Sequence, residues 1–169
     1  RNCRPELITQ RMHELIPLLS YTGCTVEYIG CNRTVVSIPF MDSTINQNGT
    51  QQAAIFYLLS DCTLAAGILG TLPGVYITGI HDRCQALPIQ FWTKQGNIQH
   101  LNPGTGVIRA VVEISPEHAL NMRQQLIQKG RTECHEIVHM YQKEKLIATG
   151  EFVIGLYADM PRAPGSRVG

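Results

Sequence analysis

The sequence has little charge and lacks the motifs of several common enzyme classes. Only 16% of its 169 residues are charged, and 14 Lys and Arg against 13 Asp and Glu give a net charge of +1. Because nucleic-acid binding by phosphate neutralisation needs a basic patch, we expect no nucleic-acid partner. A glycine-rich phosphate loop, a serine elbow and a C-x-x-C pair are also missing. These absences argue against nucleotide, serine-hydrolase and dithiol redox chemistry.

The six cysteines are scattered, without the spacing of a disulfide framework or a zinc site. We therefore expect reduced thiols in a cytoplasmic protein. The first residues contain no apolar segment typical of a secretory leader. The length suits one domain, so the sequence predicts a single domain over residues 1–160, followed by a loose tail rich in Pro, Gly, Ser and Arg over residues 161–169.

One long apolar run, residues 53–69, stands out from this ordinary composition. A helix that is apolar on every face has to be buried in protein or in lipid. The run is short for a membrane span, and Asp61 near its middle would cost about 2.5–3.5 kcal/mol in lipid. We therefore expect no membrane span but a buried core helix, with the Thr50 hydroxyl capping its start and Gly67 and Gly70 ending it.

A carboxylate in such a helix needs an explanation, because Asp is rarely buried without a partner. Asp61 can be a structural acid that bonds a neighbouring loop, since ion-pair and hydrogen-bond networks also bury acids. Asn46, however, lies fifteen residues earlier in a polar loop. The first turn of the helix also offers unpaired N–H groups that can hold an oxyanion. This combination of acid, amide and helix N–H groups indicates a candidate catalytic site.

The pattern Asn46-x-x-Gly49-Thr50-x-x-small-small, followed by Asp61, resembles the loop and central helix of the hotdog-fold acyl-CoA thioesterases. The resemblance is in particular to the phenylacetate-pathway and four-hydroxybenzoyl-CoA subgroup. In that family the loop amide and the N–H of the first small residue come from one subunit. The helix carboxylate of the dimer partner completes the site. The resemblance therefore implies that Ala53 is the oxyanion donor, Asn46 positions water or the carbonyl, and Asp61 is a general base or nucleophile.

Further residues take roles by the same resemblance. Thr93 matches a family Ser or Thr that orients the attacking water, although Thr is also a common strand residue. The residues implied in substrate binding are Gly49, Thr50, Gln52 and Ala54. The family usually has His-Gly-Gly at residues 52–54, so alanine keeps a backbone donor but narrows the approach to it. The resemblance also implies no cofactor, an acyl thioester of coenzyme A or an acyl carrier protein as substrate, and a homodimer or dimer of dimers.

The other segments predict an α+β fold, in which an antiparallel sheet wraps around the central helix. The resemblance implies that this is the hotdog fold, over about residues 20–157, with an extra helix before the last hairpin. Pro17 is expected to break the first helix near its end. From hydrophobic periodicity and turn residues we predict helices over 5–19 and 116–129, and strands over 24–29, 33–40, 75–80, 89–101, 106–115, 131–142 and 145–157.

A competing motif lies at residues 135–139, where HEIVH matches the H-E-x-x-H signature of zinc hydrolases. That signature requires a helix, so that both histidines reach one ion. Here the segment follows Gly130 and is rich in strand-forming residues. In a strand, His135 and His139 would be about 13 Å apart, too far to share a metal. We expect no metal site, and a zinc hydrolase stays a remote alternative.

Two other functions fit the same fold. A hotdog dehydratase or lyase needs a histidine beside the acid; Gln52 replaces the family histidine, but His81 could supply one. A non-catalytic acyl-binding module is the other alternative, favoured by Ala53 and Ala54 in place of glycine. We predict thioester hydrolysis ahead of both, because the acid, the amide and the helix start match the family spacing.

Overall fold

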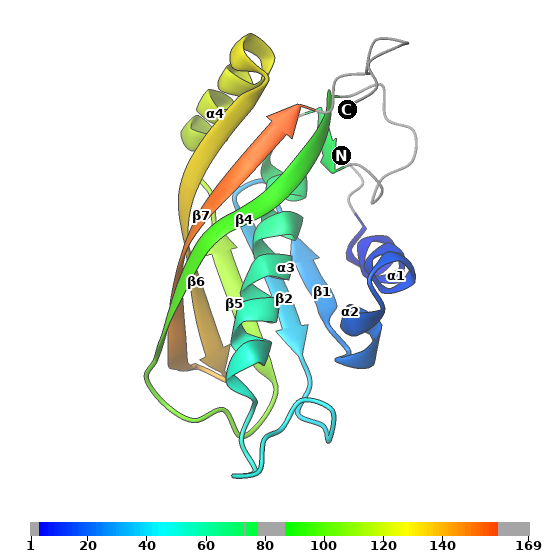
Figure 1. Ribbon diagram of the computed structural model, residues 1–169, viewed down its shortest axis with the longest axis vertical. Coiled ribbons are helices and arrows are strands. Elements are labelled where there is room, and N and C mark those ends of the chain that lie inside the picture. Colours follow the sequence, from blue (N-terminus) through cyan, green and yellow to red (C-terminus); the bar gives the residue numbers. More distant parts are fainter. Residues whose placement is uncertain (1–3, 73, 78–86, 159–169) are drawn as a thin grey trace, which may run out of the picture.

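The computed structural model describes residues 4–72, 74–77 and 87–158. Seven strands form one sheet in the order β1-β2-β5-β6-β7-β4-β3. The sheet curls around helix α3 (Figure 1), which confirms the predicted hotdog arrangement. The elements are α1 (Pro5–Leu15), α2 (Pro17–Tyr21), β1 (Thr25–Ile29), β2 (Arg33–Ile38), α3 (Ala53–Thr71), β3 (Val75–Ile77), β4 (Leu87–His100), β5 (Ile108–Glu113), α4 (Pro116–Lys129), β6 (Arg131–Gln142) and β7 (Lys145–Ala158).

Helix α3 is the centre of the hydrophobic core. By length and composition alone it could cross a membrane, but 72% of its most apolar 18-residue stretch is buried inside the protein. The strands on which it packs include β2 and β5. Burial against the sheet removes its apolar surface from water, which stabilises the fold by about 25 cal/mol per Å². The predicted buried helix is therefore confirmed.

Gly67 and Gly70 do not end this helix, contrary to the prediction, because α3 continues to Thr71. Both glycines lie where the sheet approaches the helix closely. A Cβ atom on Gly70 would lie 2.4 Å from Ile29 Cγ2 and 2.9 Å from the Gly30 carbonyl oxygen. The glycines therefore serve the packing of helix against sheet and not the termination of the helix.

Pro17 divides the predicted N-terminal helix into α1 and α2. Ile16 between them has φ −127° and ψ 89°, outside the helical region, because a proline disfavours helical backbone in the residue before it. Further along, α4 has the predicted bounds. Ser115 Oγ accepts a hydrogen bond of 3.1 Å from the His118 N–H, and Gly130 ends the helix with φ 69°.

The sheet is antiparallel except at one edge, where β3 pairs with β4 in parallel. The sequence did not indicate this parallel pair. Of the strand predicted over 75–80, the structure contains Val75–Ile77, and the rest lies outside the described residues. The same is true of the predicted tail over 161–169.

Candidate active site

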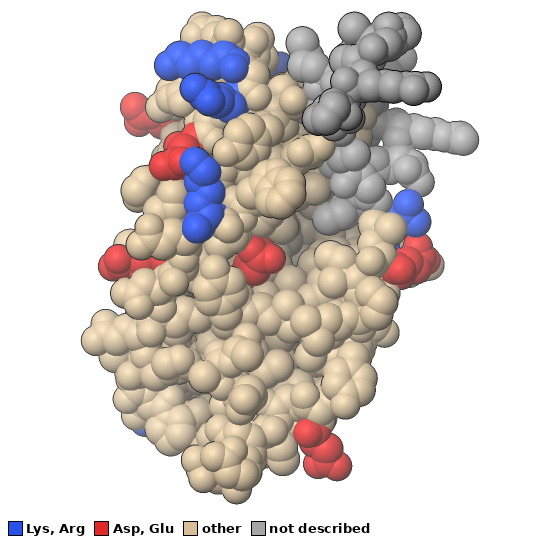
Figure 2. Space-filling model, viewed as in Figure 1, with Lys and Arg blue, Asp and Glu red and all other residues tan. Residues whose placement is uncertain are grey.

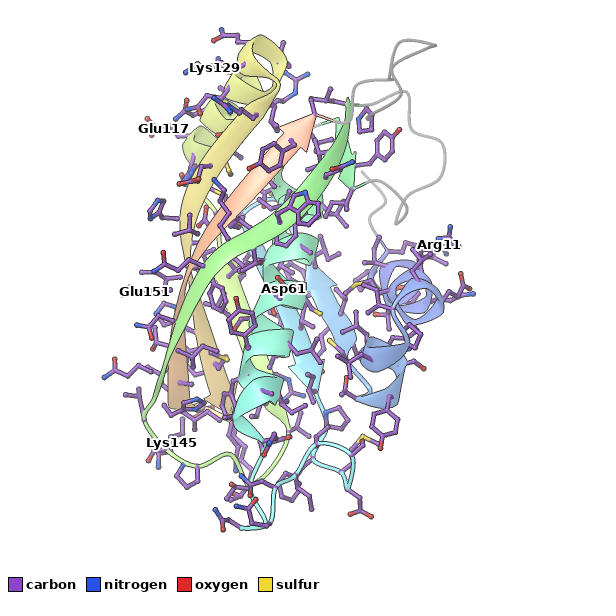
Figure 3. All side chains as sticks on the ribbon, in the orientation of Figure 1. Arg11, Asp61, Glu117, Lys129, Lys145 and Glu151 are labelled. Atoms are coloured by element: carbon purple, nitrogen blue, oxygen red, sulfur yellow. The ribbon has the colours of Figure 1, made fainter. Side chains whose placement is uncertain are left out.

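Asp61 lies midway along α3, on the side that meets β4 (Figure 3). The Thr93 hydroxyl on β4 donates a hydrogen bond to Asp61 Oδ1. Burial raises the pKa of Asp61, and the Thr93 hydrogen bond lowers it to a smaller extent. A half-buried carboxylate of raised pKa accepts a proton more readily than an exposed one, as a general base requires. The structure thus brings two predicted site residues into direct contact.

Asn46 organises the loop that leads into α3. Its Oδ1 accepts hydrogen bonds from the N–H groups of Asn48 at 2.9 Å and Thr50 at 3.2 Å. Its Nδ2 donates to Thr50 Oγ1 at 2.9 Å. Gly49 has φ 71°, a left-handed conformation that favours glycine and lets the loop turn. Within this chain, Asn46 and Thr50 therefore hold the loop in shape.

A cavity of about 360 Å³ opens beside the first residues of α3. The helix begins at Ala53, and its N-cap residue is Gln52, with extended backbone at φ −61° and ψ 138°. No described side chain caps this end, so the predicted cap by Thr50 is wrong; Thr50 lies in the loop two residues earlier. Among the described residues, none accepts a hydrogen bond from the N–H of Ala53 or Ala54. Two helix donors are therefore available at this end. The cavity is lined by Asn46, Thr50, Gln51, Ala53, Phe56, His100, Leu101, Asn102, Pro103 and Gly104.

Asp61 and Ala53 are not neighbours within one chain. Eight residues of helix separate them, which is about 12 Å along the axis. The less buried face of α3 contains Ala53, Ala54 and Asp61. Gln52 is exposed just before the helix. One protomer therefore contains two half-sites, a helix start with free donors and an acid with its hydroxyl partner.

Sequence reasoning did not assign the polar residues His100 and Gln51 to the cavity. His100 packs edge-on against Phe56, with ring centroids 4.7 Å apart. Gln51 is buried, and its Nε2 donates to the Pro39 carbonyl at 2.9 Å. No local pattern marks either residue, because both reach the cavity only through the packing of loop and strand against α3. His81, the histidine considered for lyase chemistry, lies outside the described residues.

The HEIVH segment lies in β6, as predicted, and its side chains alternate between the two faces of the strand. His135 and His139 are exposed on one face, and Glu136 is buried on the other. The helical zinc arrangement is therefore not formed. No group of three or more His, Cys, Asp or Glu side chains able to hold a metal ion occurs in the described part of the chain.

Glu136 is a second buried acid, distinct from the candidate site. Burial raises its pKa to about 7. Its Oε1 lacks a hydrogen-bond partner among the described residues, and His118 Nδ1 of α4 lies 3.8 Å away. This acid has no counterpart in the sequence predictions, because only the packing of α4 against β6 shows that it is buried.

The surface over α3 carries few charges (Figure 2). Charged side chains gather toward the upper part and the sides of this face, and most of its lower half is uncharged. None of the residues that line the cavity is Lys, Arg, Asp or Glu. Each of the described cysteines, Cys24, Cys31, Cys62 and Cys134, is free.

No family model and no curated protein matches the sequence. The fold, however, is shared with many solved structures. A Pseudomonas aeruginosa protein of unknown function, named as a probable thioesterase, has a TM-score of 0.75 at 15% identity, over 92% of this chain and 96% of that chain. A Haemophilus influenzae thioesterase has a TM-score of 0.68 at 13% identity, over 96% of each chain. At such low sequence identity, the structural likeness shows that these proteins share a fold with this chain.

Proposed function

We propose that this protein is a thioester hydrolase of the hotdog type, which releases an acyl group from coenzyme A or an acyl carrier protein. The observation that carries the proposal is that α3 contributes both parts of such a site. It carries the partly buried Asp61, which is hydrogen-bonded to Thr93, and its N-terminal residues line a cavity with free N–H groups. Solved structures of the same fold that are named thioesterases support it. The fold alone does not assign an activity.

In this proposal the thioester oxygen faces the Ala53 N–H. Negative charge that develops on the oxygen is stabilised by this donor and by the positive end of the helix dipole. Asn46 keeps the loop in place beside the carbonyl, because its amide bonds hold Thr50. Gly49, Gln52 and Ala54 shape the approach of the substrate to the helix start.

Asp61 acts on water or on the thioester itself. As a base, it takes a proton from water while the water oxygen attacks the carbonyl carbon. The C–S bond then breaks, and the thiolate takes up the proton as the free thiol. As a nucleophile, the carboxylate attacks the carbonyl carbon, the C–S bond breaks and the thiolate leaves as the free thiol after taking up a proton. Water then hydrolyses the resulting anhydride, which releases the acyl group as a carboxylic acid and restores the Asp61 carboxylate. Thr93 holds the carboxylate in position through its hydroxyl.

The separation of the two half-sites requires a second protomer. The 12 Å or so between Ala53 and Asp61 is too far for both to reach one carbonyl group, since reacting atoms must approach to about 3 Å. In a homodimer, or a dimer of dimers, the partner's Asp61 meets the helix start of the first protomer. A two-fold axis makes the arrangement reciprocal, so each dimer has two sites.

A mixing experiment with two inactive variants tests this proposal. Asp61→Asn loses the base and should lower turnover by about 10²–10⁴. Ala53→Pro deletes the oxyanion donor and should cost about 10²–10³. Proline suits the first helical position, and the extended Gln52 backbone suits the residue before it. Circular dichroism checks that both variants fold, and Ala53→Gly, which keeps the donor, is the active control.

Mixing the two variants after dissociation should restore roughly a quarter of the activity. Half of the dimers are then mixed, and each has one intact site made of Ala53 from one chain and Asp61 from the other. Release of free thiol from a panel of acyl thioesters is the readout. No recovery on mixing would show that the site is not shared, and full activity of Asp61→Asn would make Asp61 structural.

A dehydratase or lyase is the second candidate. It is favoured by His100, which lines the cavity at the helix start. Such an enzyme changes the acyl chain and leaves the thioester intact, so it releases no free thiol. The thiol assay therefore separates a dehydratase or lyase from the hydrolase. If no free thiol is released and mass analysis detects no change in the acyl group, a non-catalytic acyl-binding module is favoured.

A further inference from the structure

Among the described residues that line the cavity at the start of α3, His100 is the one whose side chain gains and loses a proton near neutral pH. The other lining groups are amides, a hydroxyl, apolar side chains and backbone, which do not change charge in that range. The proposed hydrolysis needs a proton at this place. Its leaving group is an alkyl thiolate, and alkyl thiols lose their proton only above neutral pH, so the departing sulfur has to be protonated.

His100 is held beside the first turn of the helix. It is the last residue of β4, and its ring and the ring of Phe56 pack edge to face, with centroids 4.7 Å apart. Phe56 is buried and follows Ala53 by three residues, which is less than one helical turn and about 4.5 Å along the axis. The imidazole and the Ala53 N–H therefore line the cavity from neighbouring positions.

Backbone hydrogen bonds join the two walls of the cavity. The Gln51 N–H donates to the Gly104 carbonyl at 2.8 Å, which connects the loop before α3 to the loop after β4. The Leu101 N–H donates to the Ile147 carbonyl at 2.8 Å and ties the end of β4 to β7. Figure 1 shows the end of β4 and the start of α3 at the same end of the molecule. His100 is thus kept beside the helix start.

Both nitrogen atoms of the His100 ring are available for proton transfer. The side chain is exposed, and none of the described residues forms a hydrogen bond with its ring. An exposed imidazole exchanges protons with water and with a bound group. The N–H groups of Ala53 and Ala54 hold negative charge equally well, but a backbone amide does not release its proton.

The proposed position of the thioester brings its sulfur toward this side chain. The carbonyl oxygen lies about 3 Å from its donor, the Ala53 N–H, and the sulfur is bonded to the same carbon, so the sulfur also stays at the helix start. The cavity lining contains no Lys or Arg that would balance the charge of a thiolate. An imidazolium at His100 neutralises the sulfur by giving it a proton.

We propose that His100 is the general acid that protonates the departing thiolate, an inference that rests on the proposed function. Asp61 of the partner subunit takes one proton from water, and the water oxygen bonds to the carbonyl carbon. The C–S bond then breaks, its electron pair stays on sulfur, and the imidazolium gives the sulfur a proton. The products are a carboxylic acid and a free thiol. The proton on the carboxyl group of Asp61 returns to the imidazole through solvent, which restores both groups.

Leaving groups of different basicity test this role. Two thioesters carry the same acyl group, one on N-acetylcysteamine, an ordinary alkyl thiol, and one on trifluoroethanethiol, whose thiolate is much less basic and leaves without a proton. His100→Gln keeps a polar side chain but cannot transfer a proton. Thiol release from the N-acetylcysteamine thioester should fall by about 10²–10⁴, the usual contribution of a general acid. Release from the fluorinated thioester should stay close to that of the wild type.

Two comparison variants distinguish the acid role from other effects. His139 is an exposed histidine on β6 that does not line this cavity, so His139→Gln should change neither rate. Asp61→Asn should lower both rates together, because the carbonyl carbon has to be attacked whichever thiol leaves. Circular dichroism checks that the variants are folded. His100→Ala provides a second test, since imidazole added to the buffer should restore part of the release from the N-acetylcysteamine thioester.

The outcomes separate this inference from the proposed function. Equal losses on the two thioesters in His100→Gln, or no loss on either, would reject the acid role and leave the proposed hydrolase in place. A lack of rescue by imidazole would also count against the acid role. If the wild type released no thiol from any acyl thioester, the proposed function would be rejected, and this inference with it.

Discussion

Asp61 is under two opposing influences at the residue scale. Burial raises its pKa, and the hydroxyl of Thr93 lowers it by stabilising the carboxylate. A general base has to be deprotonated, so the hydrolysis rate should fall as the pH drops through the raised pKa. In a plot of rate against pH, the fall in rate on the acidic side is the acidic limb. The Thr93 hydroxyl, which lowers the pKa of Asp61, therefore keeps this limb at a lower pH than burial alone would give.

Replacing Thr93 by valine should move that acidic limb to higher pH. Valine keeps the branched shape but removes the donor, so only the effect of burial on the Asp61 pKa remains. The measurement is kcat/KM for the best acyl thioester between pH 4 and 9. Thr149→Val on β7 changes a threonine that pairs with Gln99, six residues along β4 from Thr93, and should leave the limb in place. A shift of the limb to lower pH in Thr93→Val would mean that the hydroxyl does not stabilise the charged form.

At the element scale, the position of α3 against the sheet depends on glycines. In a solvated helix, alanine is more favourable than glycine by about 1 kcal/mol. At residue 70 the helix axis lies so close to the β1–β2 turn that the added methyl group would meet Ile29 and the Gly30 carbonyl. The packing cost then exceeds the gain in helix propensity.

Gly70→Ala should therefore destabilise the protein, by about 1–3 kcal/mol, as overpacking in a core does. Urea unfolding should show a lower midpoint with an unchanged slope. Gly106→Ala is the control. Its added Cβ would meet the end of the exposed Gln142 side chain, at 3.3 Å, rather than backbone, and should change stability by less than about 0.5 kcal/mol. A more stable Gly70→Ala protein would mean that the helix can move away from the turn at little cost.

At the scale of the whole molecule, buried acids make stability depend on pH. The folded protein keeps a proton on Glu136 up to a pKa of about 7, whereas the ordinary pKa of a glutamate side chain is 4.5. The unfolded chain loses that proton near its ordinary pKa. Between these two values the folded state binds more protons, so the free energy of unfolding falls as the pH rises through this window. Burial also raises the pKa of Asp61, so this acid likewise lowers the free energy of unfolding as the pH rises.

Glu136→Gln should remove most of this dependence. Glutamine cannot ionise, so the variant should be more stable than the wild type at pH 8, on the order of 2 kcal/mol, and nearly equal to it at pH 4, below both pKa values. Urea unfolding at both pH values measures the difference. Glu117→Gln, an exposed acid on α4, should have little effect at either pH. Lower stability of Glu136→Gln at pH 8 would mean that charged Glu136 pairs favourably with His118, 3.8 Å away.

The sequence alone determined the elements whose signals are local. Ser115, Pro116 and Gly130 fixed both ends of α4, because capping and left-handed termination act within a few residues. Pro17 broke the first helix for an equally local reason. The strand-forming residues of β6 act equally locally, so the strand identity of the HEIVH segment was also predictable. The apolar run of α3 required a surrounding sheet.

Only the tertiary structure decided which side chains meet. Asp61 and Thr93 are 32 residues apart, and their hydrogen bond depends on how α3 crosses β4. The packing role of Gly70, the burial of Glu136 and the place of His100 at the cavity also depend on contacts between distant elements. Periodicity and capping describe one segment at a time. The distances between segments are set by strand register and helix packing, which arise only when the whole chain has folded.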